Sequence, residues 1–205
     1  MFSLFRLFGK KNDMGVTTRN AYLDSHGYYL AQAQRKPIRA NGHSAPIIPY
    51  ALYDLLADKI TKEFSIFVRW DIYSYRWALH TFQHTSSCRI KLKKKSDSGH
   101  RHFVRDGEKT LEELRSYSKD HENRFELILF DGPEKNEVAP LMIPMLKANG
   151  VIVMTDDFND PYDFDRALKQ FVQAGFKTLM ITNPAPMFDT LNGALIYKPG
   201  CFVDL

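Results

Sequence analysis

The second half of the chain alternates short, continuous apolar runs with segments in which apolar residues recur at helical spacing. Residues 125–130, 150–154, 176–182 and 194–197 have the length and composition of strands. Helical segments separate the first three of these runs. Strands that are apolar on both faces and are joined by crossover helices pair mainly in parallel. The sequence therefore predicts an α/β fold with a mainly parallel sheet covered by helices on both faces.

The middle of the chain shows the same alternation with weaker signals. Residues 64–68 and 87–92 are runs of strand length, and apolar spacing indicates helices over residues 73–84 and 108–119. We therefore expect the sheet to begin near residue 64.

The N-terminal part has a different character. Residues 1–48 contain an apolar start, a helical stretch that is broken at Gly27, and a loop rich in Pro, Gly, Asn and Ser. We expect an N-terminal helical extension over residues 1–48, followed by one α/β domain over residues 49–205.

The composition fits one globular domain. Of the 205 residues, 44% are hydrophobic and 25% are charged, which provides a core and excludes wholesale disorder. The two cysteines, Cys88 and Cys201, are too few for a disulfide framework, and no run reaches the roughly 18 apolar residues of a membrane span. Neither a Gly-x-Ser-x-Gly elbow nor a Walker loop is present, which argues against hydrolases and nucleoside triphosphatases. We expect a cytoplasmic protein, and the apolar first eight residues favour a homodimer contact.

The net charge of +4 conceals an asymmetry. Residues 131–205 carry six Lys/Arg against ten Asp/Glu, so residues 1–130 carry a net charge of +8. The densest basic run, residues 89–105, either meets an anionic partner or is a solvated loop. We expect a protein partner or an anionic small molecule. Nucleic acid is disfavoured because no stacking aromatic residues or known nucleic-acid motif accompany the run.

The second half also resembles a known family. The pattern Phe-Glu-Leu-Ile-Leu-Phe-Asp-Gly from residue 125, the pattern Gly-Val-Ile-Val-Met-Thr-Asp-Asp-Phe from residue 150, and the closing Gly-Ala-Leu-Ile-Tyr from residue 193 resemble class I S-adenosylmethionine-dependent methyltransferases. This resemblance implies a Rossmann-like methyltransferase fold whose last strand runs antiparallel to the others. It also implies a cofactor site beyond the carboxyl ends of the strands.

The chain departs from that family where the cofactor would bind. After the first strand the family carries a Gly-x-Gly turn, because only glycine lets the backbone approach the cofactor closely. Here Trp70 and Ile72 stand at those positions. The second strand ends in lysines, Lys93 among them, in place of the acidic residue that holds the ribose. The positions that resemble the family's cofactor contacts are Trp70, Asp71, Tyr73, Ser74 and Lys93.

Carboxylates follow two neighbouring strands of the predicted sheet. Asp131 ends one strand, and Asp156 and Asp157 end the next. This arrangement resembles metal-dependent O-methyltransferases of the catechol type, in which such acids bind Mg²⁺ and a nearby lysine acts as base. The resemblance implies a metal site of Asp131, Asp156 and Asp157, with Asp131 and Lys135 as catalytic residues. The alternative is that these acids cap the helices that follow.

Two functions from different classes remain open on the sequence. The first is a methyltransferase-like protein that has lost standard S-adenosylmethionine binding, needs no cofactor and acts as a non-catalytic or repurposed binding protein. The second is an active S-adenosylmethionine-dependent O-methyltransferase, Mg²⁺-assisted in one version, acting on an unknown small molecule or glycan.

Overall fold

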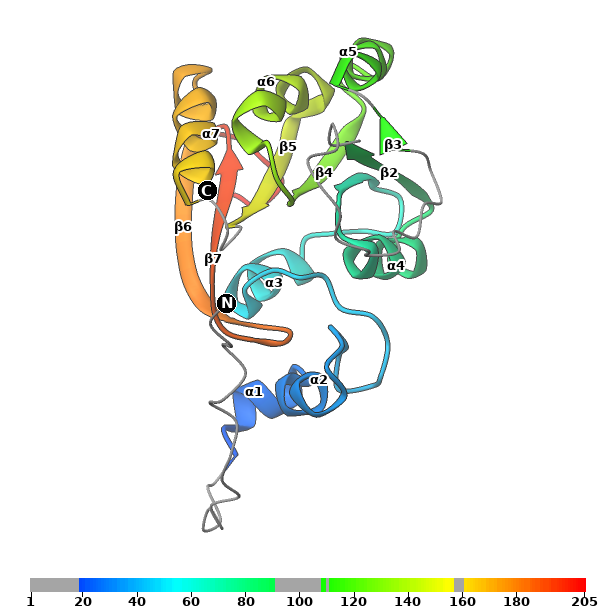
Figure 1. The fold of residues 1–205 in the computed structure, drawn as a ribbon, viewed down its shortest axis with the longest axis vertical. Coiled ribbons are helices and arrows are strands. Elements are labelled where there is room, and N and C mark those ends of the chain that lie inside the picture. Colours follow the sequence, from blue (N-terminus) through cyan, green and yellow to red (C-terminus); the bar gives the residue numbers. More distant parts are fainter. Residues whose placement is uncertain (1–18, 91–107, 110, 157–160) are drawn as a thin grey trace, which may run out of the picture.

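The computed structural model describes residues 19–90, 108–109, 111–156 and 161–205. They form one seven-stranded sheet with helices on both faces (Figure 1). The elements in chain order are α1 (Ala21–Ser25), α2 (Tyr28–Gln34), α3 (Tyr50–Ala57), β1 (Ser65–Arg69), α4 (Ile72–Thr81), β2 (His84–Ile90), β3 (Glu108–Lys109), α5 (Leu111–Asp120), β4 (Phe125–Phe130), α6 (Lys135–Met145), β5 (Leu146–Thr155), α7 (Pro161–Gln173), β6 (Lys177–Ala185) and β7 (Phe188–Tyr197).

The order of strands across the sheet is β3-β2-β1-β4-β5-β7-β6. Each neighbouring pair from β3 to β5 is parallel, whereas β7 runs antiparallel to both β5 and β6. This is the predicted Rossmann-like methyltransferase fold, with its mainly parallel sheet and antiparallel closing strand. The carboxyl ends of β1, β4 and β5 therefore meet at one edge of the sheet.

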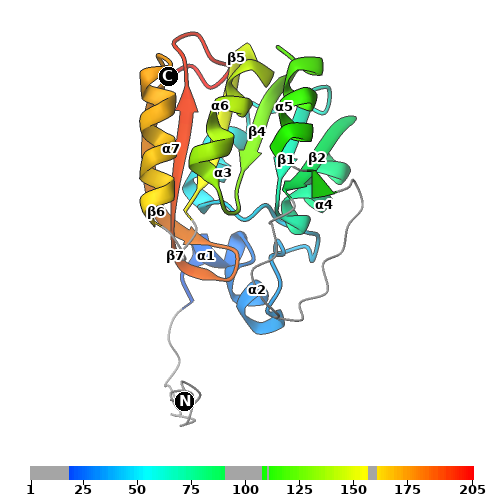
Figure 2. The same cartoon turned by 45° about the horizontal axis from the view of Figure 1, so that its top comes forward.

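Two hydrophobic clusters cover the two faces of the sheet. Along β1, Phe67 packs in a cluster with α5, α6 and α7, while its neighbours Ile66 and Val68 pack in a second cluster with α3 and α4. Alternate residues of a strand point to opposite faces, so a strand that is apolar throughout requires helices on both sides. Figure 2 shows α5, α6 and α7 in front of the sheet.

Several elements differ in extent from the sequence-based expectation. The helix expected over 73–84 ends at Thr81, because Phe82 turns to an extended conformation and buries its ring beside α3 and α4. Strand β2 then begins at His84 instead of residue 87. Residues 108 and 109, expected to begin a helix, form the short edge strand β3. The final hairpin is also longer than expected, since β7 begins at Phe188.

The described part of the N-terminal segment lies beyond the carboxyl ends of the strands, where Figure 2 shows α1 and α2. The helical stretch breaks at Gly27, as expected. Gly27 has φ +83, and a Cβ there would lie 2.3 Å from the backbone nitrogen of Ala40, so only glycine fits. The Tyr28 hydroxyl donates a hydrogen bond to Asp189 of β7. The division into an extension and a domain at residue 48 stays a prediction.

Among the described residues, no helix is both long and apolar enough to cross a membrane.

Candidate functional site at the carboxyl edge of the sheet

A small cavity lies where β1, β4 and β5 end. The volume inside it that the centre of a water molecule can reach is about 10 Å³. This is enough for about one water. It lies on the α3 and α4 side of the sheet and is closed by residues that precede α3. The lining residues are Ile47, Ile48, Val68, Arg69, Asp71, Ser74, Leu129, Phe130, Asp131, Val153 and Thr155.

Trp70 closes the gap between the loops that follow β1 and β4. Its backbone has φ +82, a left-handed conformation that favours glycine. Its side chain lies directly against Gly132, because a Cβ on Gly132 would be 2.4 Å from Cγ of Trp70. The backbone at position 70 thus has a conformation that favours glycine, although the side chain there is a large indole ring.

Asp71 and Ser74 hold the start of α4. Asp71 caps the helix, accepting hydrogen bonds from the backbone N–H groups of Tyr73 at 3.0 Å and Ser74 at 2.6 Å. The hydroxyl oxygen of Ser74 accepts a hydrogen bond from the N–H of Ile47 at 3.0 Å. Of these two candidate cofactor-contact residues, Asp71 therefore caps α4 and Ser74 connects α4 to the N-terminal segment.

Two carboxyl groups at this edge have perturbed acidity. Burial raises the pKa of Asp131 above its ordinary value of 3.8, although the positive charge of Lys135 acts in the opposite direction. Burial also raises the pKa of Asp71, and the charge of Asp131 adds to that effect. Asp131 accepts a hydrogen bond from the Thr155 hydroxyl at 3.0 Å.

Two buried cations contact the loop that follows β4. Arg69 is fully buried and donates hydrogen bonds to the carbonyl oxygens of Asp131, at 2.6 Å, and Pro133. Lys135, which is 1% exposed, donates from Nζ to the carbonyl oxygen of Gly132 at 2.6 Å. Both cations therefore hold the backbone of this loop. Sequence reasoning did not single out Arg69, although one arginine ending an apolar strand is a signal that could have done so.

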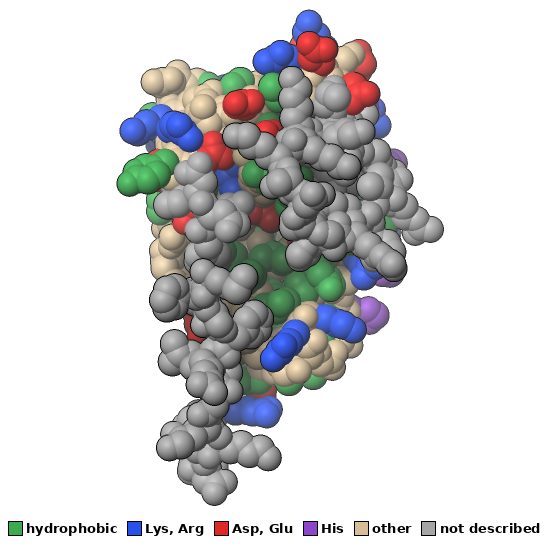
Figure 3. All heavy atoms as spheres, in the orientation of Figure 1, with side chains coloured by type: hydrophobic (Ala, Val, Ile, Leu, Met, Phe, Trp, Pro, Cys, Tyr) green, Lys and Arg blue, Asp and Glu red, His purple; other side chains and the backbone are tan. Residues whose placement is uncertain are grey.

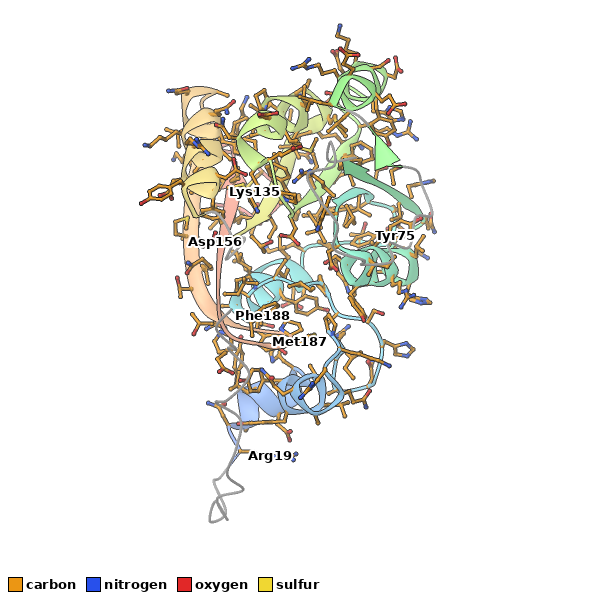
Figure 4. The ribbon with its side chains drawn as sticks, in the orientation of Figure 1. Arg19, Tyr75, Lys135, Asp156, Met187 and Phe188 are labelled. Carbon is orange, nitrogen blue, oxygen red and sulfur yellow. The ribbon has the colours of Figure 1, made fainter. Side chains whose placement is uncertain are left out.

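The predicted metal ligands have different partners. Asp131 accepts a hydrogen bond from the Thr155 hydroxyl. Asp156 instead accepts one from the Asn192 side chain at 3.3 Å. The Oδ1 atom of Asp156 is buried and has no partner among the described residues. Figure 4 shows Asp156 after the end of β5 and Lys135 at the start of α6. Asp157 and Lys93 lie outside the described residues. Within the described ranges, no group of three or more His, Cys, Asp or Glu side chains could hold a metal ion.

The described residues leave little space in the position that the resemblance implies for S-adenosylmethionine. The cavity at the carboxyl edge has room for about one water, and the indole ring of Trp70 fills the space next to Gly132. A site for a ligand of cofactor size needs a far larger cleft.

The perturbed acidity of Asp131 leads to a prediction about stability. A carboxyl group whose pKa is raised by folding stabilises the protein fully below its unfolded-state pKa, and this contribution is lost as the pH rises through the folded-state pKa. Asparagine retains an oxygen that accepts from Thr155 but does not ionise. As the pH rises from about 4 to about 7.5, we expect wild type to lose stability relative to the Asp131→Asn variant. Urea unfolding at both pH values measures this difference, and parallel pH profiles would contradict it.

The fold can be compared with that of solved structures. No protein-family model matches the sequence, and no curated relative matches it either. The chain is similar to an O-methyltransferase from Bacillus cereus in complex with SAH, with a TM-score of 0.51 and 12% identity over 89% of this chain and 94% of that one.

Two further similar structures are larger proteins. The first is the MycE methyltransferase of the mycinamycin biosynthetic pathway, in complex with Mg and SAH, with a TM-score of 0.46, 13% identity, and coverage of 72% of this chain and 45% of that one. The second is spermidine synthase from Thermotoga maritima, with a TM-score of 0.47, 15% identity, and coverage of 70% and 56%. The chain thus spans less than two thirds of the length of either.

The similarity to the Bacillus cereus enzyme extends over nearly the whole of both chains, so the fold is that of class I S-adenosylmethionine-dependent methyltransferases. At 12% identity the likeness shows the fold alone.

Proposed function

We propose that this protein has the methyltransferase fold without the standard S-adenosylmethionine site, and that it acts by binding a protein or an anionic small molecule. The observation that carries this proposal is the position of Trp70, whose ring lies against Gly132 in the space between the loops after β1 and β4. A ligand placed there would have to displace the indole ring.

The surroundings of Lys135 support the same proposal. A general base must reach the proton that it abstracts. Nζ of Lys135 is buried and donates to the carbonyl oxygen of Gly132, and the backbone N–H of Lys135 donates to Asp163 at 2.6 Å. These hydrogen bonds favour a structural role for Lys135, in which it stabilises the loop after β4.

Isothermal titration of the full chain with S-adenosylmethionine, in the presence and absence of Mg²⁺, tests the proposal. We expect no binding heat and no rise in melting temperature. The circular dichroism spectrum of the same sample shows that the protein is folded, and an active methyltransferase titrated in parallel shows that the cofactor is intact. Binding at micromolar concentration would overturn the proposal.

The second candidate is an active O-methyltransferase, with or without Mg²⁺. It is favoured by the raised pKa values of Asp71 and Asp131, since perturbed carboxyl groups at the edge of a sheet are frequent at active sites. If the titration detects binding, the Asp131→Asn variant separates a catalytic role from a structural one. Loss of methyl transfer with retained folding would then support this candidate.

A further inference from the structure

A second cavity lies outside the sheet, between the N-terminal segment, α3 and the turn that joins β6 to β7. The volume inside it that the centre of a water molecule can reach is also about 10 Å³. This is enough for about one oxygen atom of a ligand. Figure 4 shows Met187 and Phe188 at the neighbouring hairpin turn, close to α3. The cavity is lined by His26, Arg39, Ala45, Pro46, Ile48, Tyr50, Tyr53 and Pro186.

Tyr50 contributes a buried donor that lacks a partner. Its side chain is 3% exposed, and its hydroxyl makes no hydrogen bond with any described residue. Burial raises the pKa of this hydroxyl, so it stays protonated and can donate. Buried hydroxyl groups in folded proteins almost always have a partner. An acceptor atom inside the cavity that Tyr50 lines would provide one.

Arg39 contributes an exposed cation on the same cavity. Its guanidinium lies over the ring of Tyr53, 5.2 Å from the centroid. A tight turn fixes its backbone, because its N–H donates to the carbonyl of His43 at 2.8 Å and its carbonyl accepts from Gly42 at 2.9 Å. No carboxylate among the described residues forms a salt bridge with Arg39.

One acid that contacts a lining residue of the cavity already has partners. Asp54 of α3 accepts hydrogen bonds from His26 at 2.7 Å and from the Tyr22 hydroxyl at 2.8 Å. The ring of His43, in the same turn as Arg39, lies 6.3 Å from the ring of His80 of α4. Figure 3 shows Lys, Arg and His side chains gathered beside hydrophobic surface at the lower right of this face.

We propose that this second cavity binds the oxyanion group of a small organic phosphate or carboxylate. One oxygen enters the cavity and accepts a hydrogen bond from Tyr50, and the remaining oxygens meet the guanidinium of Arg39. Arginine presents several N–H donors in a plane, which suits an oxyanion. Because the cavity has room for about one oxygen atom, the organic part of the ligand stays outside it. This inference rests on the proposed binding function and names its ligand class.

Titration of the full chain with phenyl phosphate and with benzoate tests the inference, with chemical-shift changes or binding heat as the readout. We expect at least one probe to bind, and Arg39→Gln to weaken that binding by about tenfold or more, because a charge-assisted hydrogen bond is lost. Tyr50→Phe should also weaken binding while leaving the free protein at least as stable, since it removes only an unpartnered hydroxyl. Lys36→Gln is the matched control, because Lys36 is an exposed cation three residues before Arg39 that does not line the cavity.

Binding of phenyl phosphate alone identifies a phosphate ester, and binding of benzoate alone identifies a carboxylate. Either result supports the inference if Arg39→Gln weakens binding and Lys36→Gln does not. The inference is overturned if neither probe binds to folded protein, or if all variants bind as the wild type does. These outcomes are independent of the S-adenosylmethionine titration, so failure here would leave the absence of a standard cofactor site as a separate result.

Discussion

Replacing Arg69 by alanine is expected to lower the free energy of unfolding by about 3–5 kcal/mol, as the loss of one member of a buried charged network does. The side chain is fully buried, and its guanidinium lies 5.2 Å from the ring centroid of Phe130. Its removal leaves the carbonyl groups of Asp131 and Pro133 without these donors and opens a cavity beside β4. Urea unfolding of both proteins measures the difference.

Two further variants make the experiment specific. Arg69→Met keeps much of the volume but donates no hydrogen bond, so its stability should fall between those of wild type and Arg69→Ala. Lys147→Ala removes a partly exposed ion pair with Glu126 and should change stability by less than about 1 kcal/mol. A similarly small effect of Arg69→Ala would show that the guanidinium does not hold the loop after β4.

The second prediction concerns Trp70: the Trp70→Gly variant should be more stable than the Trp70→Ala variant. At φ +82, any residue with a Cβ is strained by roughly 1–2 kcal/mol, whereas glycine is not. Both substitutions remove the indole ring and its contact with Gly132, so the difference between the two variants isolates the backbone. We expect Trp70→Gly to exceed Trp70→Ala in the free energy of unfolding by about 1–2 kcal/mol.

The matched control for this pair is Leu79, an exposed residue in the interior of α4. There the usual order holds, and Leu79→Ala should be more stable than Leu79→Gly by about 1 kcal/mol. The glycine variant should therefore be the more stable one at position 70, and the alanine variant the more stable one at position 79. The same order at both would mean that position 70 does not have a left-handed backbone in solution.

The parts of the fold that could be predicted from sequence are those whose burial is uniform. The run over residues 125–130 coincides with β4 because all of its residues except Glu126 are buried between two layers of helices. Strand β2 and the short strand β3 could not be placed well, because polar residues such as Ser86, Glu108 and Lys109 carry little strand signal. Their pairing depends on tertiary contacts that a local pattern does not contain.

The candidate site was predictable only in part, for a related reason. Trp70 could be singled out because a large side chain replaces an expected glycine in a short motif. Its contact with Gly132 could not be predicted, since it depends on how the loops after β1 and β4 approach each other. Tyr50 and Arg39 also come from separate segments, and only the folded chain places them on one cavity.

The hydrogen bond between Ile47 and Ser74 connects the N-terminal segment to the rest of the fold. Ala31 of α2 is fully buried, and Ile48 is buried in the cluster that contains α3 and α4. A protein shortened to start at residue 49 would lose these contacts and expose an apolar surface. Removal of the described N-terminal residues is therefore expected to destabilise the start of α4 as well.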